Sequence, residues 1–421
     1  MLETKKGWTR LLAAAAVMVP GMALAAGECG SGEVSFLALI TPNLTAEIYL
    51  GLIDRFNDQH PDITIQMIQS SGQPHEEYAR LLLSTGSFPD VAGSLNIDRA
   101  SFFRPDVLAP LPLDDDAQLI RNVESETTDG DLFAYTPFSQ PISLVFYNKA
   151  MFEAAGITED MLPPANMAEF EAMLYQVRDE GMVPMAVANS WAAGWAFFQL
   201  TQPTVFLESP EWYIERTEGA VTFADGTWER GAERFVRWAA DGIFDPDALS
   251  TDYASGQGKF LAGDAATWVM GSFFTAAAGD QDFEIGVFPV PTETGEQVIN
   301  LRTDPNSISV SVTADPMAAA ICFAKFMALD QESNKTLAEA DGLFSNLAVP
   351  PALELTDLQK QIADYIASLP SLPTALGRGS SQPVAGLTSE YTAVAEAMLQ
   401  GSMTAAEAMA QLDDYWGSQS E

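Results

Sequence analysis

Side chains of the kind that bind polyhydroxylated molecules gather in the loops after the expected strands of this chain. Flat rings pack against the C–H faces of such ligands, while amides, carboxylates and arginine exchange hydrogen bonds with hydroxyl groups. Open α/β sheets bind ligands beyond the carboxyl ends of their strands, where these loops lie. The candidate binding residues are Asn43, Gln73, Asn96, Asp98, Gln140, Trp191, Trp195, Phe273, Asp304 and Arg378.

Two tryptophans are prominent candidates for a ring that packs against a ligand. Trp191 and Trp195 follow an expected strand over 182–188, in a loop rich in Ser, Gly and Ala whose small side chains leave room beside the rings. One of the two rings could instead belong to the core, and we favour Trp191 for the site. Trp268 lies in the middle of another expected strand and is assigned to the core.

Two arginines could give the site a different preference. Arg302 is close in sequence to Asp304 and Asn306, and Arg378 lies between two glycines. Either guanidinium could bind a ligand carboxylate through two parallel hydrogen bonds, which would favour an anionic ligand. The alternative is that each arginine forms an ordinary ion pair with one of the many carboxylates of the chain.

Signatures of catalysis are missing from the sequence. It contains no G-x-S-x-G, H-E-x-x-H or G-x-x-x-x-G-K-[ST] motif. A secreted glycosidase would need two carboxylates at a set separation, and an acidic chain offers no way to select the pair. His60 and His75, without a cluster of cysteines, do not make a zinc site. We therefore expect a binding protein without a cofactor or metal, and keep a secreted hydrolase as the alternative.

The chain is strongly acidic, with 20 basic and 58 acidic residues among 421 and a formal net charge of −38. Such a surface repels nucleic acids and anionic membranes. It suits a saline medium, because salt screens the repulsion between like charges. The length exceeds what one hydrophobic core usually serves, which predicts two lobes or domains.

The N-terminus has the layout of a secretory signal peptide, expected over residues 1–26. Basic residues precede an apolar run of small side chains that ends at a cleavage site near Ala25 and Ala26. The run is shorter than the roughly 20 apolar residues of a membrane-spanning helix, so an anchor is the less favoured alternative. Lipid attachment at Cys29 is not expected, because Glu28 rather than a small residue precedes it.

An alternation of strands and helices opens the mature chain. Strands are expected over 34–40, 63–67 and 91–95, and apolar residues at helical spacing predict helices over 48–56 and 75–86 between them. This order is typical of an open α/β sheet. Near the end of the chain, Thr404 and Glu407 are spaced as a capping box that starts a further helix.

A later strand-to-helix turn is the most informative segment. An apolar run from Ile142 to Tyr147 predicts a buried strand, Asn148 stands where a helix cap belongs, and Gly156 ends the helix that follows. The turn reads Y-N-K-x-x-F-x-x-A-G.

This turn and several other segments resemble the extracellular solute-binding proteins of ABC importers, in particular their sugar-binding, maltose-binding-protein-like branch. In the segment 260–273 two residues depart from the family's pattern, with Thr267 in place of a methionine and Phe273 in place of a tryptophan, and the segment 107–111 lacks the family's glycine. The matching segments follow one another in order over nearly the whole mature chain and lie at 56–65, 84–91, 107–111, 129–137, 260–273, 286–291 and 399–407.

The resemblance implies an α/β protein with the two-lobe periplasmic binding protein fold of type II-like topology. Open sheets flanked by helices would be joined by a hinge with multiple crossovers, near 138–141, 288–292 and 345–350. Lobe one would contain residues 27–138 and 292–345, and lobe two residues 139–291 and 346–421.

The resemblance further implies a periplasmic substrate-binding component of an ABC importer. Such a protein is a monomer that closes around a mono- or oligosaccharide and delivers it to the membrane permease. A uronate, glycerol phosphate or polyamine is the alternative ligand for the same fold, and presentation of the ligand to a receptor is an alternative role. Phe273 would supply the stacking ring, with Phe274 as the second choice, and Gln140 would stand where maltose-type relatives place a carboxylate.

The two cysteines of the chain, Cys29 and Cys322, leave two possibilities open. They could form a disulfide in an oxidising periplasm. Cys322 could equally remain a buried thiol in an apolar helix.

Overall fold

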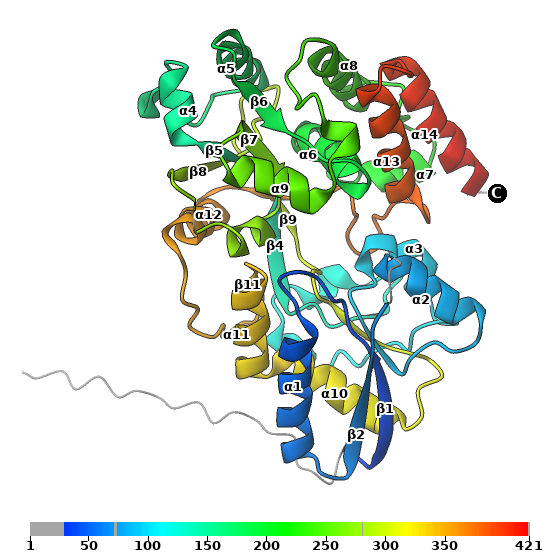
Figure 1. Ribbon diagram of the computed structural model, residues 1–421. Helices are drawn as coiled ribbons and strands as arrows, with labels where there is room; N and C mark the ends of the chain where they lie inside the picture. The colour runs from blue at the N-terminus through cyan, green and yellow to red at the C-terminus, as the bar shows by residue number, and fades with distance from the viewer. Residues whose placement is uncertain (1–28, 71–73, 280, 420–421) are drawn as a thin grey trace, which may run out of the picture.

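The chain folds into two lobes joined by strands that run between them (Figure 1). The computed structural model describes residues 29–70, 74–279 and 281–419. The lower lobe in Figure 1, lobe one, contains the N-terminal elements together with the yellow helices, and the upper lobe, lobe two, contains the green and red ones. The predicted two-lobed α/β class is confirmed. The predicted signal peptide lies outside the described residues.

Lobe one is built on a four-stranded sheet in the order β10-β3-β1-β2. β1 runs parallel to both β2 and β3, while β10, from much later in the chain, pairs with β3 in the antiparallel direction. The strands are β1 (Gly32–Leu37), β2 (Ile63–Ile68), β3 (Val91–Gly93) and β10 (Ile308–Val310). The helices of this lobe are α1 (Ala46–Gln59), α2 (His75–Ser84), α3 (Arg99–Phe102), α10 (Met317–Leu329) and α11 (Gln331–Ala340).

Lobe two is built on a second four-stranded sheet in the order β6-β7-β5-β8. The central strand β5 is antiparallel to both β7 and β8. The strands are β5 (Leu144–Asn148), β6 (Val183–Ala186), β7 (Ala265–Met270) and β8 (Ile285–Pro289). The helices are α4 (Lys149–Ala154), α5 (Met167–Asp179), α6 (Trp191–Glu208), α7 (Trp212–Thr217), α8 (Thr227–Ala240), α9 (Tyr253–Leu261), α12 (Asp357–Ser368), α13 (Leu387–Leu399) and α14 (Ala405–Gln419).

A third sheet forms the connection between the lobes, in the order β11-β4-β9-β12. Its strands come from four separate parts of the chain: β4 (Phe138–Ile142), β9 (Ile299–Arg302), β11 (Phe344–Ser345) and β12 (Ser371–Leu372). β4 leads into β5 of lobe two through Ser143, whose φ of 59° turns the strand. The connection is therefore a set of paired extended segments, while the predicted lobe boundaries stay a prediction.

Each lobe has its own hydrophobic core. In lobe two, buried side chains from 142–290 and 362–416 form one large cluster. In lobe one, a cluster drawn from 29–138 and 308–347 packs the sheet, and a smaller one lies beneath α2 and α3. Trp268 is buried in the lobe two core, as predicted. Within the described ranges, no helix is apolar over enough of its length to cross a membrane.

The segment around the two tryptophans was predicted as a loop, and this prediction is wrong. Trp191 begins helix α6, and Trp195 lies one turn further along it. Every residue of this helix from Ala192 to Phe206 is buried, so the sequence shows no helical alternation of apolar and polar residues. Gly194 reads as a loop signal but serves close packing, because a Cβ there would lie 2.8 Å from the Thr392 backbone nitrogen on α13.

Local signals at two helix starts are confirmed. The Asn148 side chain accepts a hydrogen bond from the Met151 amide and so caps α4. Thr404 and Glu407 exchange side chain to backbone hydrogen bonds in both directions, which is a capping box at the start of α14.

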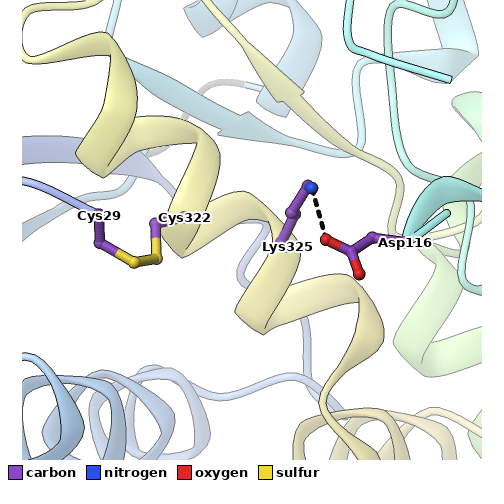
Figure 2. Close-up of a disulfide and its surroundings, with 4 residues drawn as sticks. All are labelled: Cys29, Asp116, Cys322 and Lys325. Carbon is purple, nitrogen blue, oxygen red and sulfur yellow. Dashed lines mark hydrogen bonds and ion pairs between the residues drawn. A yellow bond between two sulfur atoms is a disulfide. The ribbon is translucent and has the colours of Figure 1, made fainter. Parts of the chain in front are cut away.

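A disulfide joins the start of the described chain to helix α10 (Figure 2). Cys29 precedes β1 and Cys322 lies within α10, so of the two possibilities left open by the sequence the structure has the bonded one. One turn along α10, Lys325 donates to Asp114 and Asp116 over 2.7 and 2.6 Å and so ties the helix to a preceding loop. Lys325 and Asp116 are drawn in Figure 2.

His60 lies beside this disulfide, and its ring nitrogen and the two sulfur atoms are within 4.8 Å of one another. The sulfurs are bonded to each other, and zinc is bound by thiolates. In the oxidised protein this group therefore has no thiolate to offer a metal ion.

Candidate ligand-binding site

A polar cluster forms where the connecting strands meet lobe one. Gln140 of β4 and Arg302 of β9 are directly opposite one another in the third sheet, and both side chains are buried. Arg302 Nε donates to Asp304 Oδ1 over 3.1 Å, and its Nη1 lies 3.4 Å from Gln140 Oε1. Asn96, fully buried in the short helix η1 (Asn96–Asp98), contacts both Asp304 and Arg302. The hinge strands therefore carry polar side chains directly into the site.

A fully buried arginine holds this cluster in place from behind. Arg99 donates to Asp304 over 3.0 Å and lies 3.9 Å from a carboxylate oxygen of Glu126. Its guanidinium also packs over the ring of Phe103 at 4.3 Å. Asp304 therefore binds two guanidinium groups, which compensate its burial and fix the position of Arg302.

Asn43 links the polar cluster to lobe two. This residue follows β1, and its Nδ2 donates to Asp341 Oδ1 over 3.0 Å and to the Phe273 backbone oxygen over 3.2 Å. Asp341 lies directly after α11 of lobe one, whereas Phe273 belongs to the short helix η6 (Ser272–Ala276) after β7 of lobe two. A single amide thus spans the junction of the two lobes.

Asp341 is a carboxylate in an unfavourable place for charge. Burial raises its pKa to about 6, although the hydrogen bond from Asn43, the positive charge of Arg302 and the amide of Asn306 act in the opposite direction. Burial, and to a smaller extent the charge of Asp341, raises the pKa of Tyr253 on α9.

Glu76 is a second such carboxylate, in the first turn of α2. Burial raises its pKa, and the charges of His75, Arg302 and Arg80 lower it less than burial raises it. Its Oε1 atom is buried and has no hydrogen-bond partner.

Asn306 adds an unpartnered donor. The residue is in the left-handed region, with φ of 51°, and its Oδ1 accepts a hydrogen bond from Ser94 Oγ over 3.2 Å. Its Nδ2 is buried without a close hydrogen-bond partner, although the Asn306 amide lowers the pKa of Asp341. Buried polar groups of globular proteins are almost always paired, so the incompletely paired Asn306 amide and the unpartnered Glu76 Oε1 favour a site that a ligand completes.

Four aromatic rings of lobe two gather beside this polar cluster. The Trp191 ring lies 5.5 Å from Trp195 and 4.8 Å from Tyr253, between ring centres. Phe273 joins them at 5.9 Å from Trp195 and 6.5 Å from Tyr253. Trp195 is buried, Tyr253 and Phe273 are half-buried, and Trp191 is 39% exposed. Trp191, Tyr253 and Phe273 can therefore offer ring surface to a ligand, while Trp195 supports them. Phe274, the second choice for the stacking ring, is fully buried in the lobe two core.

Two of the predicted site residues make contacts between the lobes at the edge of the polar cluster. Arg378 Nε donates to the Glu126 carboxylate over 2.9 Å, so the residue is in an ion pair between lobes. Asp98 pairs with Arg80 over 2.5 Å and accepts a long hydrogen bond of 3.3 Å from the Gly386 amide of lobe two. Gln73, also predicted for the site, lies outside the described residues.

The sequence prediction missed Glu76, Tyr253 and Asp341. Glu76 lies in the first turn of the helix after the second strand, and Asp341 lies just before the third predicted crossover between the lobes. Both residues follow predicted elements, so their positions in the sequence could have marked them as candidates for the site. Tyr253 had no such signal, because α9 follows a long irregular segment after α8 and no motif places its first turn beside Trp191.

Comparison with known families and structures gives a consistent result. A family model described as bacterial extracellular solute-binding protein matches residues 41–333. No curated protein matches the chain in sequence.

Solved structures show the same two-lobe fold at low sequence identity. A chitin oligosaccharide binding protein is 20% identical, with a TM-score of 0.78, over 93% of this chain and 99% of the other. The GacH receptor of Streptomyces glaucescens, solved unliganded and with acarbose, is 19% identical with a TM-score of 0.71, over 92% and 98%. A sugar transporter protein of Bacillus licheniformis in complex with stachyose is 16% identical with a TM-score of 0.70, over 92% and 100%.

Proposed function

Because the chain belongs to the bacterial extracellular solute-binding proteins, we propose that its solute is a sugar, captured between the two lobes for an ABC importer. The observation that carries this proposal is the meeting of an aromatic cluster on lobe two with unpartnered polar groups on lobe one. Sugars need both: rings for the C–H faces, and amides and carboxylates for the hydroxyl groups. Similar structures with bound or named oligosaccharides support the same ligand class.

Hinge closure would perform the capture. Gln140 and Arg302 lie on the connecting strands themselves, so a ligand that contacts them also contacts the moving part of the protein. A ligand that touches Trp191 on one lobe and Asp341 on the other stabilises the closed arrangement by its additional contacts. Binding and release suffice for this role, so we expect neither catalysis nor a cofactor.

The alternative of an anionic ligand is less well supported. Both arginines that could bind a carboxylate are already paired, Arg302 with Asp304 and Arg378 with Glu126. A uronate or a phosphate would have to displace these partners, and the carboxylates of Glu76 and Asp341 add further negative charge to this part of the protein. The charge of the site therefore favours neutral or cationic ligands.

Export to the periplasm follows from the same proposal. The family is extracellular, and residues 1–26 have the layout of a signal peptide with cleavage near Ala25 and Ala26. The partner would be the permease of an importer, and the protein would act as a monomer.

Thermal melting of the mature protein tests the ligand class. A panel of neutral sugars, uronates, polyols, amines and phosphates is added in excess. A true ligand at 100 times its Kd should stabilise the native state by about 2.7 kcal/mol. For lobes of this size that corresponds to a rise in Tm of about 5–10 °C.

The variant Trp191→Ala should abolish the rise, and Trp191→Phe should keep most of it. Leu50→Ala removes a side chain of similar exposure from α1 of lobe one and serves as the control. A rise confined to uronates or phosphates, or a rise that survives Trp191→Ala, would contradict the proposal.

A further inference from the structure

A histidine and the two bridged cysteines meet in the core of lobe one. Cys29 precedes β1, His60 is the C-cap residue of α1, and Cys322 lies in α10 (Figure 2 draws the two cysteines). A ring nitrogen of His60 and the two sulfur atoms all lie within 4.8 Å of one another. The three residues come from distant parts of the chain, so the sequence shows no metal-binding spacing where the fold assembles three donor atoms.

His60 is buried with a ring nitrogen that lacks a partner. The residue is 7% exposed, and its Nδ1 atom is buried without a hydrogen-bond partner in the described part of the chain. The centre of its ring lies 4.6 Å from that of the Phe56 ring, so apolar contact holds the imidazole beside the sulfur atoms. Buried polar atoms are almost always paired, and neutral imidazole is the commonest metal ligand in proteins. The ring therefore has a donor for which the oxidised protein supplies no partner.

The three donors form a set that suits zinc once the sulfur atoms are free. Zinc is bound by thiolates and imidazole, and three protein ligands leave its fourth tetrahedral position to a water molecule. Cys29 and Cys322 are both buried. Burial of unbalanced charge is costly, and a divalent ion balances two thiolates. Copper(I) binds the same soft ligands but leaves one negative charge unbalanced, so the burial of the site favours zinc.

We infer that lobe one binds one zinc ion through Cys29, His60 and Cys322 whenever the two thiols are not bonded to each other. Every newly made chain passes through this dithiol state before the bridge forms. Each thiol releases its proton to solvent as its sulfur binds zinc, and no electron is transferred. Zinc and the disulfide exclude one another, because both use the same two sulfur atoms. The inference is independent of the proposed sugar-binding function.

Zinc titration of the reduced mature protein tests this inference. A water-soluble phosphine reduces the bridge: the phosphine takes the oxygen of a water molecule, the two protons go to the sulfur atoms, and excess phosphine is removed under argon. The reduced protein should bind one zinc ion per chain at least about 100-fold tighter than the oxidised protein, measured by competition with a chromophoric chelator. The oxidised protein is the blank for weak binding to the many carboxylates of the chain. Equal binding by the two forms would overturn the inference.

Two histidine variants locate the site. His60→Phe removes both ring nitrogens but keeps a ring against Phe56, and it should weaken zinc binding by the reduced protein about tenfold or more. His75→Gln changes the other histidine of the chain, which contacts the Gly93 carbonyl oxygen, and should leave the zinc affinity as in the wild type. Equal zinc affinities of the reduced wild type and reduced His60→Phe would refute the assignment of His60.

Two further measurements separate this site from binding to an unfolded dithiol. Far-UV circular dichroism of the zinc-bound reduced protein should match that of the oxidised protein, and zinc bound to an unfolded chain would overturn the inference. Zinc should also slow re-oxidation by oxidised glutathione, which accepts the two electrons and two protons of the dithiol, by about tenfold or more, because metal-bound thiolates are withdrawn from exchange. Tight binding of copper(I) without binding of zinc would overturn the choice of a divalent ion.

Discussion

Replacement of both bridged cysteines by alanine is expected to destabilise lobe one strongly. The bridge closes a loop whose ends, Cys29 and Cys322, are 293 positions apart. In the chain-entropy description, closing a loop of this length removes about 19 cal/mol/K from the unfolded chain, or about 5–6 kcal/mol at 25 °C. Measured contributions of native bridges reach about 5 kcal/mol, so we expect a loss of about 4–5 kcal/mol in the free energy of unfolding.

The magnitude depends little on how lobe two behaves. If lobe two stays folded while lobe one unfolds, the effective loop is about half as long. Each halving of a loop changes the closure term by only about 0.6 kcal/mol. The estimate therefore holds for either order of unfolding.

Two spectroscopic signals recorded in one urea titration can show which lobe loses stability in the alanine variant. Every tryptophan within the described ranges lies between 191 and 416 and belongs to lobe two, so tryptophan fluorescence follows that lobe, while far-UV circular dichroism follows both. The variant should show an early transition by circular dichroism and a fluorescence transition close to that of the wild type.

The wild-type protein with its bridge reduced is the control, since it lacks the cross-link but keeps both sulfur atoms in the core. It should unfold at nearly the same urea concentration as the alanine variant. A loss of less than about 1 kcal/mol in both proteins would refute the argument from loop closure.

The remaining predictions concern the site and the contacts between lobes. Phe273→Ala should weaken sugar binding by about tenfold through lost ring contact, measured by calorimetry, with Phe88→Ala in lobe one as the control. Arg378→Ala removes an ion pair between lobes in which the arginine side chain is about one-third exposed, so it should weaken ligand affinity less than fivefold. It should also increase the radius of gyration of the ligand-free protein in X-ray scattering. Arg104→Ala, whose ion pair with Asp106 lies within lobe one, should change neither the affinity nor the radius of gyration. Asp341→Asn should stabilise the ligand-free protein by about 2–3 kcal/mol at pH 8 but not at pH 4. The raised pKa of about 6 means that the folded protein favours the protonated carboxyl, so the wild type loses stability as the pH rises through that value. Urea titrations at both pH values measure the effect of the substitution, and equal effects at pH 4 and pH 8 would contradict the prediction. Thr404→Ala should lower the free energy of unfolding by about 1 kcal/mol through loss of the α14 cap, seen as a lower Tm.

The fold could be predicted where side chains alternate between buried and exposed, and at helix ends. The strand-to-helix turn at Asn148 and the capping box at Thr404 depend on neighbouring residues, and both are confirmed. Helix α6 could not be recognised, because a helix buried on every side has no periodic signal.

The site could be predicted only in part. Asn43, Asn96 and Asp304 follow strands β1, β3 and β9, and Gln140 lies within β4 opposite Arg302, so the pairing of these strands brings them to one end of lobe one. Arg378 had an open choice between a ligand and an ion pair, and the structure shows the ion pair with Glu126, 252 positions away. Partners this distant in sequence depend on the packing of two lobes, which no local pattern records.

The position of the disulfide also sets the order of events during synthesis and export. A chain that leaves the cytoplasm N-terminus first presents Cys29 long before Cys322, and β3 meets its outer neighbour β10 only shortly before Cys322 arrives. Until then the early thiol has no second thiol in the described chain with which to pair wrongly. The disulfide can therefore form only when lobe one is nearly complete. An oxidation assay on nascent chains of increasing length would show the chain length at which the sheet of lobe one assembles.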